Sequence, residues 1–517
     1  MSIALAFYCR IKPGPELSAN HQLLRFNWQL SRNAAFQLSQ QAGLKPRVRG
    51  NVRDMSGPNA VTFPAGQDAS ETIEILDPAT GATVGKVAMT GMAEIDSCLE
   101  MANRVQPIWA RTPASERAAA LRAGAALLRE RAEELAELNR VETGRPLSES
   151  KEGVAAGAAT LEQYAELGLV HRGKSLQGNF EATDLMVWEP RGVVVALTPW
   201  NDPVAVSCGL LGAALVTGNT VVYKPSERAP HTGGLLGDLL AGALPEGVLQ
   251  TVQGDGRVGA LLAARSDVDV VAHVGSTATG RSIAKSAATT GAKALLENGG
   301  NDALVVDTGV DPVWAAGQAA LGAFANSGQI CVSVERIFAH RDVAEAFLAA
   351  LVAEAEARTV APLVDRRHRD HVHAHVREAV DHGAELMTGG VVPDGAGAHY
   401  PATVLAHCDP KMRIMREETF GPLAPVWVVD TFEQGIAEAA NDDYGLAATV
   451  LTPSMANAQR AWRELPVGTV KINAVFGGAP GGAAHPRRAS GAGFGYGPEL
   501  LDEMTQTKVV HLRPAKI

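Results

Sequence analysis

The sequence has few cysteines, and they form neither a metal motif nor a disulfide framework. Five occur in 517 residues, and no two have the Cys-x-x-Cys spacing of zinc or redox sites. A small, odd and scattered set is typical of a reducing compartment, so we expect a cytoplasmic protein without a bound metal. The cysteines are Cys9, Cys98, Cys208, Cys331 and Cys408.

Long apolar runs and an excess of positive charge are also missing. No uninterrupted apolar stretch reaches the roughly 18 residues that a membrane span needs. The net charge of -10 argues against binding to nucleic acid or to an acidic membrane surface. The hydrophobic content of 46% and charged content of 20% are those of an ordinary globular protein. The length indicates two or three domains.

Acidic residues are scarce in residues 1–54, which carry eight basic and only two acidic side chains. A basic, acid-poor N-terminus is typical of an organelle transit peptide. The alternative is that translation starts at Met55 and that the preceding stretch is a start-site error or disordered. We favour the start at Met55, because no clear basic amphipathic helix is visible. Import into an organelle would follow only from a genuine transit peptide.

Strands and helices alternate along most of the remaining sequence. A β-branched strand at Val193–Leu197, a small-residue helix over about 204–217 and a strand at Thr220–Tyr223 form a β-α-β unit, which predicts a parallel sheet. The pattern repeats at Val268–Val274, followed by a glycine-bearing turn and a helix. Such turns at the carboxyl ends of strands bind nucleotides in doubly wound sheets. Earlier in the chain, we expect one long helix from Pro113 to Glu142.

One cysteine stands in a loop that suggests chemistry. Cys331 ends the stretch Phe-Ala-Asn-Ser-Gly-Gln-Ile-Cys, and Glu297 lies 34 positions earlier in Glu-Asn-Gly-Gly. A thiol nucleophile and a carboxylate base are the groups needed to form a thioester and then hydrolyse it. A lone cysteine is more often buried and inert, and we keep that interpretation for Cys98, Cys208 and Cys408.

Six motifs follow one another in a fixed order, and together they are far more specific than any one of them. They are Thr198-Pro-Trp-Asn-Asp-Pro203, Lys224-Pro-Ser-Glu227, Gly275-Ser276…Gly280, Glu297-Asn-Gly-Gly300, Gly328-Gln-Ile-Cys331 and Glu417-Glu-Thr-Phe-Gly-Pro422. In these motifs the chain resembles the aldehyde dehydrogenase superfamily over about residues 70–512.

The resemblance implies an α/β fold with a Rossmann-like cofactor domain, an α/β catalytic domain and a small bridging β element for oligomerisation. The limits it implies are 55–167 and 191–297 for the NAD-binding domain and 298–490 for the catalytic domain. Residues 168–190 and 491–517 would form the bridging element. It also implies a homodimer or homotetramer.

By the same resemblance, Cys331 is the nucleophile, Glu297 activates the hydrolytic water and Asn201 donates its amide to the oxyanion. Losing one oxyanion donor typically costs about 3 kcal/mol of transition-state stabilisation. The reaction would oxidise an aldehyde to the carboxylic acid with NAD(P)+. Coenzyme-A-acylating relatives generally lack the glutamate, so Glu297 argues against that alternative. Cys331, Glu297 and Asn201 together argue against an inactive structural homologue.

The cofactor residues are also implied by matching motifs. Lys224 and Glu227 would hold the adenosine ribose, and a carboxylate there favours NAD over NADP. Ser226 could soften that preference, so NADP stays an alternative. The remaining cofactor residues would be Trp200, Gly275, Ser276, Gly280, Glu418 and Phe420.

The departures from the family pattern concern the substrate entrance. Asp202 replaces a frequent aromatic, and Val206 and Gly209 stand where many relatives carry bulky groups. We therefore expect a wider and more acidic entrance, in which Asp202 attracts an amino-aldehyde. The competing hypothesis is that Arg487 and Arg488 clamp a carboxylate-bearing semialdehyde.

Overall fold

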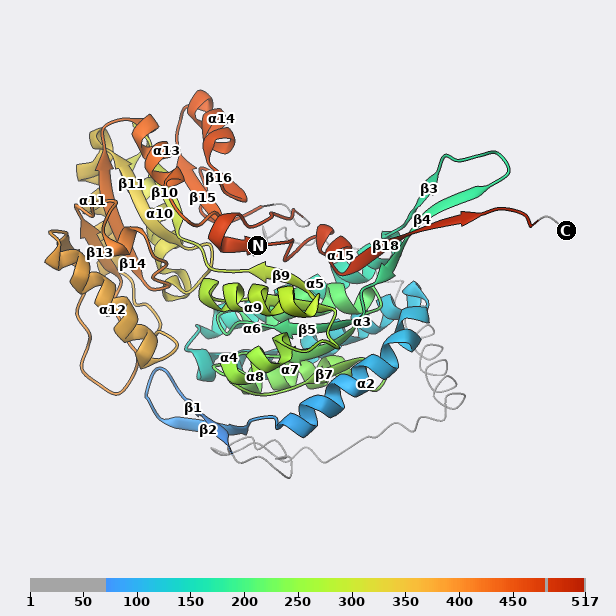
Figure 1. Cartoon of the computed structure of the whole chain (residues 1–517). Coiled ribbons are helices and arrows are strands. Elements are labelled where there is room, and N and C mark those ends of the chain that lie inside the picture. The colour runs from blue at the N-terminus through green and yellow to red at the C-terminus, as the bar shows by residue number, and fades with distance from the viewer. Residues whose placement is uncertain (1–70, 479–481, 516–517) are drawn as a thin grey trace, which may run out of the picture. The chain divides into compact units, whose positions relative to one another are not determined.

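The computed structural model describes residues 71–478 and 482–515. The stretch 1–54, with its two interpretations, lies outside these residues. The described chain begins with an antiparallel hairpin, β1 (Thr72–Leu76) and β2 (Thr83–Ala88). Four helices follow before the first sheet (Figure 1): α2 (Met92–Arg111), α3 (Ala114–Glu130), α4 (Ala132–Thr143) and α5 (Leu147–Val170).

The first large sheet has six strands in the order β17-β9-β8-β5-β6-β7. Its neighbouring strands are parallel, except that β17 is antiparallel to β9. Alternate residues of β5 pack into two different hydrophobic clusters, because helices cover both faces of the sheet. The strands are β5 (Val193–Leu197), β6 (Thr220–Lys224), β7 (Leu249–Thr251), β8 (Val270–Val274), β9 (Lys293–Glu297) and β17 (Gly491–Ala492). The connecting helices are α6 (Pro203–Val216), α7 (Pro230–Gly242), α8 (Gly256–Ala263) and α9 (Thr277–Thr290).

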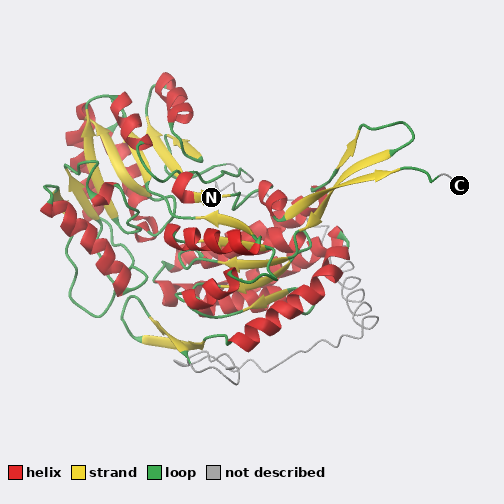
Figure 2. Ribbon diagram, in the orientation of Figure 1, coloured by secondary structure: helices red, strands yellow, loops and turns green. Residues whose placement is uncertain are grey.

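The second large sheet has seven strands in the order β12-β13-β14-β11-β10-β15-β16. Its neighbouring strands are parallel, except that β12 is antiparallel to β13. Figure 2 shows its strands between helices. The strands are β10 (Asp302–Val306), β11 (Val334–His340), β12 (Glu385–Thr388), β13 (Thr403–Ala406), β14 (Leu423–Val429), β15 (Ala447–Leu451) and β16 (Thr469–Ile472). The helices are α10 (Pro312–Phe324), α11 (Arg341–Glu356), α12 (Arg366–Asp381), α13 (Phe432–Ala440) and α14 (Met455–Glu464), with short 3-10 turns η1 (Ala325–Gly328), η2 (Arg413–Met415) and η3 (Arg488–Ser490).

A third, antiparallel sheet has the order β18-β4-β3. It joins β3 (Lys174–Leu176) and β4 (Thr183–Pro190) to β18 (Thr505–Leu512), which follows the short helix α15 (Glu499–Glu503). The C-terminal strand thus pairs with a hairpin more than 300 positions earlier in the sequence. The predicted α/β class with parallel sheets is confirmed.

Two expectations differ from the structure. The single helix expected from Pro113 to Glu142 is two helices, α3 and α4, which meet at Arg131 although neither glycine nor proline stands there. Its end is as expected, since Gly144 adopts a left-handed φ of 76° as the C-cap. In addition, β17 pairs with β9, so residues 491–492 belong to the six-stranded sheet and not to the bridging element.

We propose that the six-stranded sheet marks the cofactor domain, the seven-stranded sheet the catalytic domain and the third sheet the bridging element. Among the described residues, no helix is long and apolar enough to cross a membrane. The same residues contain no group of three or more histidine, cysteine, aspartate or glutamate side chains that could hold a metal ion.

Candidate active site

The Asn201 and Cys331 motifs, 130 positions apart, line one cavity. Asn201 lies just after β5, at the carboxyl edge of the six-stranded sheet, and Cys331 follows η1 at the entry to the seven-stranded sheet. The cavity has a volume of about 230 Å³. Its walls also include six of the predicted residues or their motif neighbours: Trp200, Gly275, Ser276, Asn298, Glu418 and Phe420. The structure therefore brings five of the six motifs together around the Cys331 thiol, and only Lys224-Pro-Ser-Glu227 does not line this cavity.

The loop before Cys331 has a strained backbone. Asn326, Ser327 and Gly328 adopt consecutive positive φ angles of 46°, 56° and 74°. Such angles are uncommon for side chains other than glycine and persist only where surrounding contacts enforce them. At Gly328 a Cβ would lie 2.0 Å from the Gly421 carbonyl oxygen, so only glycine fits. This conformation turns the chain so that Cys331 reaches the cavity.

The side-chain amide of Asn201 is directed toward the cysteine loop. Asn201 is 7% exposed, and its Nδ2 donates to the Gln329 carbonyl oxygen at 3.0 Å. Asn326 donates from its own amide to the same oxygen at 3.2 Å. An amide fixed at this position next to a thiol can donate to the oxyanion that forms when the thiol's sulfur attacks a carbonyl carbon.

Glu297 ends β9 and is 5% exposed. Its Oε1 accepts a hydrogen bond from the Gly495 N–H at 2.8 Å, and a Cβ at Gly495 would collide with the carboxylate. Burial raises the pKa of Glu297 to about 7, although the Gly495 bond acts in the opposite direction. A carboxyl group that titrates near neutral pH can take a proton from water and release it again.

The Cys331 thiol is surrounded by acidic groups. Burial raises its pKa to about 12, and the negative charges of Glu297, Asp302 and Glu418 add to this shift. Lys471 on β16, which the sequence motifs did not indicate, lies in the same electrostatic environment. Burial lowers the pKa of Lys471, while Asp302 and Cys331 act in the opposite direction. Burial and the neighbouring negative charges thus both disfavour the thiolate, and a positive charge near the sulfur would favour it.

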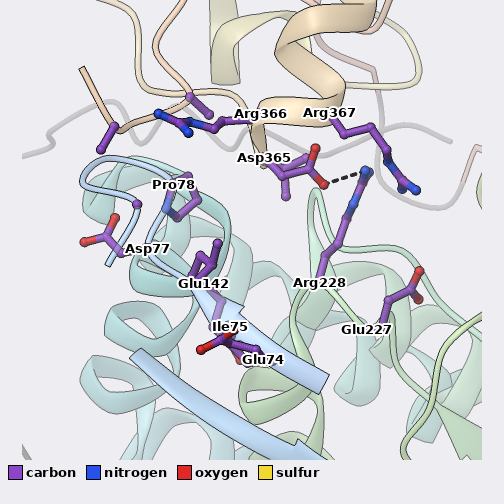
Figure 3. Close-up of a pocket in the computed structure, with 15 residues that line it drawn as sticks. Glu74, Ile75, Asp77, Pro78, Glu142, Glu227, Arg228, Asp365, Arg366 and Arg367 are labelled. Atoms are coloured by element: carbon purple, nitrogen blue, oxygen red, sulfur yellow. Dashed lines mark ion pairs between the residues drawn. The ribbon is translucent and has the colours of Figure 1, made fainter. Parts of the chain in front are cut away.

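Lys224 and Glu227 lie where the motif predicts, at the end of β6. Lys224 is 6% exposed and donates from Nζ to the Gly254 carbonyl at 2.6 Å, while Nζ lies 3.9 Å from Glu227 Oε2. Glu227 lines a second pocket of about 430 Å³ (Figure 3). At that pocket Arg228 forms an ion pair with Asp365 at 2.6 Å. Ser226 binds the Arg228 N–H through its hydroxyl and is half-buried.

The glycine-bearing turn after β8 begins helix α9. Ser276 is its N-cap, and its hydroxyl accepts from the Thr279 N–H at 3.3 Å. Gly280 packs against the Asn298 side chain, because a Cβ there would lie 2.0 Å from Asn298 Oδ1. Gly275 donates its N–H to the Glu297 carbonyl at 3.0 Å. The N-terminus of α9 therefore faces the cavity with a partial positive charge.

The Glu418 and Phe420 motif is held by a residue that the motifs did not include. Glu335 accepts bonds from the Thr419 N–H and hydroxyl and from the Phe420 N–H, at 3.1, 2.6 and 2.9 Å. This fixes Phe420 at a φ of 53°. Glu418 accepts from the Gly300 N–H at 3.0 Å, and burial, aided by the charge of Glu335, raises the pKa of Glu418 to about 8.

His368 on α12 was also missed, because it lies in a helix rich in charged residues and histidines and belongs to none of the six motifs. Its Nε2 donates to the Phe420 carbonyl at 2.8 Å, and its ring meets those of Trp200 and Phe420 edge-on. Burial lowers the pKa of His368 to about 4, so the ring is neutral. His371 lies one turn further along and also lines the cavity.

One of the two substrate expectations, a free Asp202 carboxylate at the entrance, is wrong in its geometry. Asp202 is 3% exposed, and its carboxylate pairs with Arg145 at 3.0 Å, so it offers no free charge at an entrance. Arg488 donates to the carbonyls of Ala440 and Asp442, and Arg487 is exposed.

The residues present fit a nicotinamide dinucleotide. The cavity combines a helix N-terminus for phosphate, a carboxylate at Glu418 for a ribose hydroxyl and an aromatic ring at Phe420. At Gly299 a Cβ would lie 1.9 Å from Glu418 Oε2. Only glycine at this position therefore leaves room for the Glu418 side chain at the cavity.

Residues 65–510 match the aldehyde dehydrogenase family. A betaine aldehyde dehydrogenase of Cereibacter sphaeroides is 34% identical over 471 residues, which cover 87% of this chain and 95% of that protein. Among solved structures, lactaldehyde dehydrogenase from Escherichia coli is 32% identical, with a TM-score of 0.84 over 86% of this chain and 97% of the other. Betaine aldehyde dehydrogenase from Staphylococcus aureus in complex with NAD+ is 28% identical, with a TM-score of 0.84 over 88% and 94%. The chain belongs to the aldehyde dehydrogenase family and is an NAD(P)-dependent enzyme that oxidises an aldehyde to the carboxylic acid.

Proposed function

We propose that Cys331, Asn201 and Glu297 carry out the aldehyde oxidation in two chemical stages. In the first, the Cys331 sulfur releases its proton to water and forms a bond to the aldehyde carbon, while the carbonyl oxygen becomes an oxyanion. The Asn201 amide and the Cys331 N–H donate to that oxygen. Trp200, Ser276, Glu418 and Phe420 would hold NAD(P)+, which when bound would accept the hydride that the thiohemiacetal on Cys331 loses as it becomes a thioester.

In the second stage, Glu297 takes a proton from water, and the hydroxide attacks the thioester carbon. The carbon–sulfur bond breaks, the acid leaves, and the proton that Glu297 took from water returns to the sulfur and restores the thiol. The observation that carries this proposal is the shared cavity of Cys331 and Asn201, with a buried carboxylate titrating near neutral pH beside it. Glu297 favours hydrolysis over transfer of the acyl group to coenzyme A.

A panel of aldehydes assayed with NAD+ tests this function. We expect reduced nicotinamide and free acid in equal amounts, without any need for coenzyme A. If the product forms only with coenzyme A and appears as its thioester, hydrolysis is not the second stage. The absence of reduced cofactor with every aldehyde would instead support an inactive homologue.

The pH dependence of hydrolysis provides a further prediction. Because Glu297 must be deprotonated to act as a base, and burial raises its pKa to about 7, the rate should fall as the pH drops through this value. The rate of thioester hydrolysis, measured after a single turnover, checks this. In Glu297→Gln the acid limb near pH 7 should disappear, and a limb that persists unchanged would assign it to another group.

We propose that NAD is preferred over NADP. Glu227 lines the pocket in which the adenosine ribose would lie, and the neighbouring Arg228 is paired with Asp365 (Figure 3). Glu227→Ser should raise kcat/KM for NADP relative to NAD by about tenfold or more, because like-charge contacts are strongly unfavourable.

Arg367 lines the same pocket and has no ion-pair partner among the described residues. Arg367→Ala in that background should lower NADP use again, and an unchanged ratio in Glu227→Ser would contradict the assignment.

For the substrate, we propose a small polar aldehyde. The relatives named for betaine aldehyde and lactaldehyde support this class. An amino-aldehyde remains among the candidates, but it would be recognised without a free Asp202 carboxylate. A panel with betaine aldehyde, lactaldehyde, a semialdehyde and an alkyl aldehyde ranks these classes by kcat/KM.

We also propose a cytoplasmic homodimer or homotetramer. The scattered cysteines support a reducing compartment. The edge strand β18 leaves Val509 68% and Leu512 55% exposed, and edge strands of this kind commonly pair with another chain. Sedimentation velocity measures the assembly directly, and a monomer at micromolar concentration would contradict it.

A further inference from the structure

A buried ion pair lies directly behind the Asn201 amide. Arg145, just before α5, and Asp202, at the start of α6, are 8% and 3% exposed, and Arg145 Nη1 lies 3.0 Å from Asp202 Oδ1. Burying two charges is costly unless their geometry is good, so such a pair is weak evidence for added stability. Added stability alone therefore does not explain why the Arg145–Asp202 pair is buried next to Asn201.

Asp202 does not serve its helix in the usual way. It is the N-cap residue of α6, where an aspartate normally accepts a bond from a backbone N–H two or three positions on. Asp255, Asp311 and Asp365 cap their helices in this manner. The Asp202 side chain accepts no such bond. Its carboxylate is instead directed to Arg145.

The same guanidinium nitrogen holds the backbone of Asn201. Arg145 Nη1 donates to the Asn201 carbonyl oxygen at 2.8 Å. The only other side chain bonded to this oxygen among the described residues is Asn326, through a longer contact of 3.4 Å. Arg145 is thus the principal restraint on the peptide unit from which the Asn201 amide extends toward the cysteine loop.

Helix α5 also makes room for the pair. At Gly153 a Cβ would lie 2.6 Å from Asp202 Oδ1, a separation that no side chain could accept without moving the carboxylate. The segment leading into α5 supplies the cation, and the helix itself supplies the space for the anion. The arrangement is built from two helices that meet beneath the oxyanion donor.

We propose that Arg145, oriented by Asp202, is a positioning residue that holds Asn201 in place to stabilise the oxyanion. This inference rests on the proposed function of Asn201. It gives Asp202 a task within the protein instead of contact with a cationic substrate. The expected signature is a fall in kcat with little change in KM, because the oxyanion develops after the aldehyde has bound.

The pair is best removed as a unit, so that no charge is left buried alone. The variant Arg145→Met with Asp202→Asn should lower kcat by about 10- to 100-fold, since small displacements at a reacting centre have effects of this size. KM for the aldehyde should stay within about threefold. The matched control is the exposed pair Arg129–Glu162, which lies 2.5 Å apart between α3 and α5. Arg129→Met with Glu162→Gln should keep kcat unchanged.

A double-mutant cycle separates positioning from general structural support. In an Asn201→Ala background, removal of the Arg145–Asp202 pair should cost less than about threefold in kcat, because residues that act through one group are not additive. If the two losses multiply, Arg145 does not act through Asn201. A kcat equal to that of the wild type would also overturn the proposal, as would a selective loss of activity toward amino-aldehydes.

Two further measurements keep the test decisive. If the double replacement unfolds, Asp202→Asn alone retains the shape of the side chain and must still lower kcat. Arg145→Lys should recover part of the rate, because it keeps the charge but loses the planar donor geometry. A wild-type enzyme that oxidises no aldehyde would refute the proposed function itself, whereas an active enzyme insensitive to these changes refutes only the positioning role.

Discussion

Replacing Cys331 with alanine is expected to abolish aldehyde oxidation, lowering kcat by about 10⁴-fold or more. Losses of this order follow when a covalent nucleophile is removed, because the remaining groups only bind and polarise the substrate. Because Cys331 is half-buried at the wall of the cavity, the smaller side chain should not unfold the protein. The production of reduced nicotinamide with excess aldehyde is the measurement.

The control for this variant is Cys98→Ala. Cys98 is also half-buried, and burial raises the pKa of its thiol to about 11, but it lies on α2, away from the cavity. It should retain full activity. Binding of NAD+ to Cys331→Ala, followed by calorimetry, should be close to that of the wild type. Substantial turnover by Cys331→Ala would assign the nucleophile elsewhere.

Glu297→Gln is expected to separate the two stages of the reaction. The amide can still accept the Gly495 N–H bond, so the local geometry is preserved, but it cannot take a proton from water. Thioester formation should continue, and hydrolysis should slow by about 10²- to 10⁴-fold. The result is a burst of one reduced nicotinamide per active subunit, followed by slow turnover.

Hydroxylamine provides the control for this prediction. It attacks thioesters without general-base assistance, so it should restore turnover in Glu297→Gln and release the hydroxamate. The same reagent should have little effect on Cys331→Ala. A Glu297→Gln enzyme without a burst, or one that hydroxylamine does not rescue, would place Glu297 before thioester formation.

The sequence predicted the local elements around the site well, because they depend on short-range signals. The β-branched run at Val193–Leu197 forms β5 over those same residues, and Gly144 ends its helix in the left-handed conformation. The ordered motifs also predicted which segments would meet at the cavity. Three of these segments follow β5, β8 and β9 at the carboxyl edge of the six-stranded sheet, whereas the Cys331 and Glu418 segments precede β11 and β14 of the seven-stranded sheet.

What the sequence did not predict depends on contacts between distant segments. Asp202, the residue after Asn201 in its motif, suggested an exposed charge. Its partner Arg145 lies 57 positions earlier, so no sequence signal indicated the ion pair. Glu335 gave no signal, although it binds the Thr419–Phe420 backbone 84 and 85 positions later. Side chains of this kind are identified only once the fold has placed their partners.

The central claim is that Cys331 carries the acyl group and Glu297 releases it. The most direct test is the mass of the Cys331 peptide from Glu297→Gln, quenched in acid after reaction with aldehyde and NAD+. We expect one acyl group on that peptide, at close to one per active subunit, and its disappearance after treatment with hydroxylamine. An unmodified Cys331 peptide, or the acyl group on another residue, would contradict it.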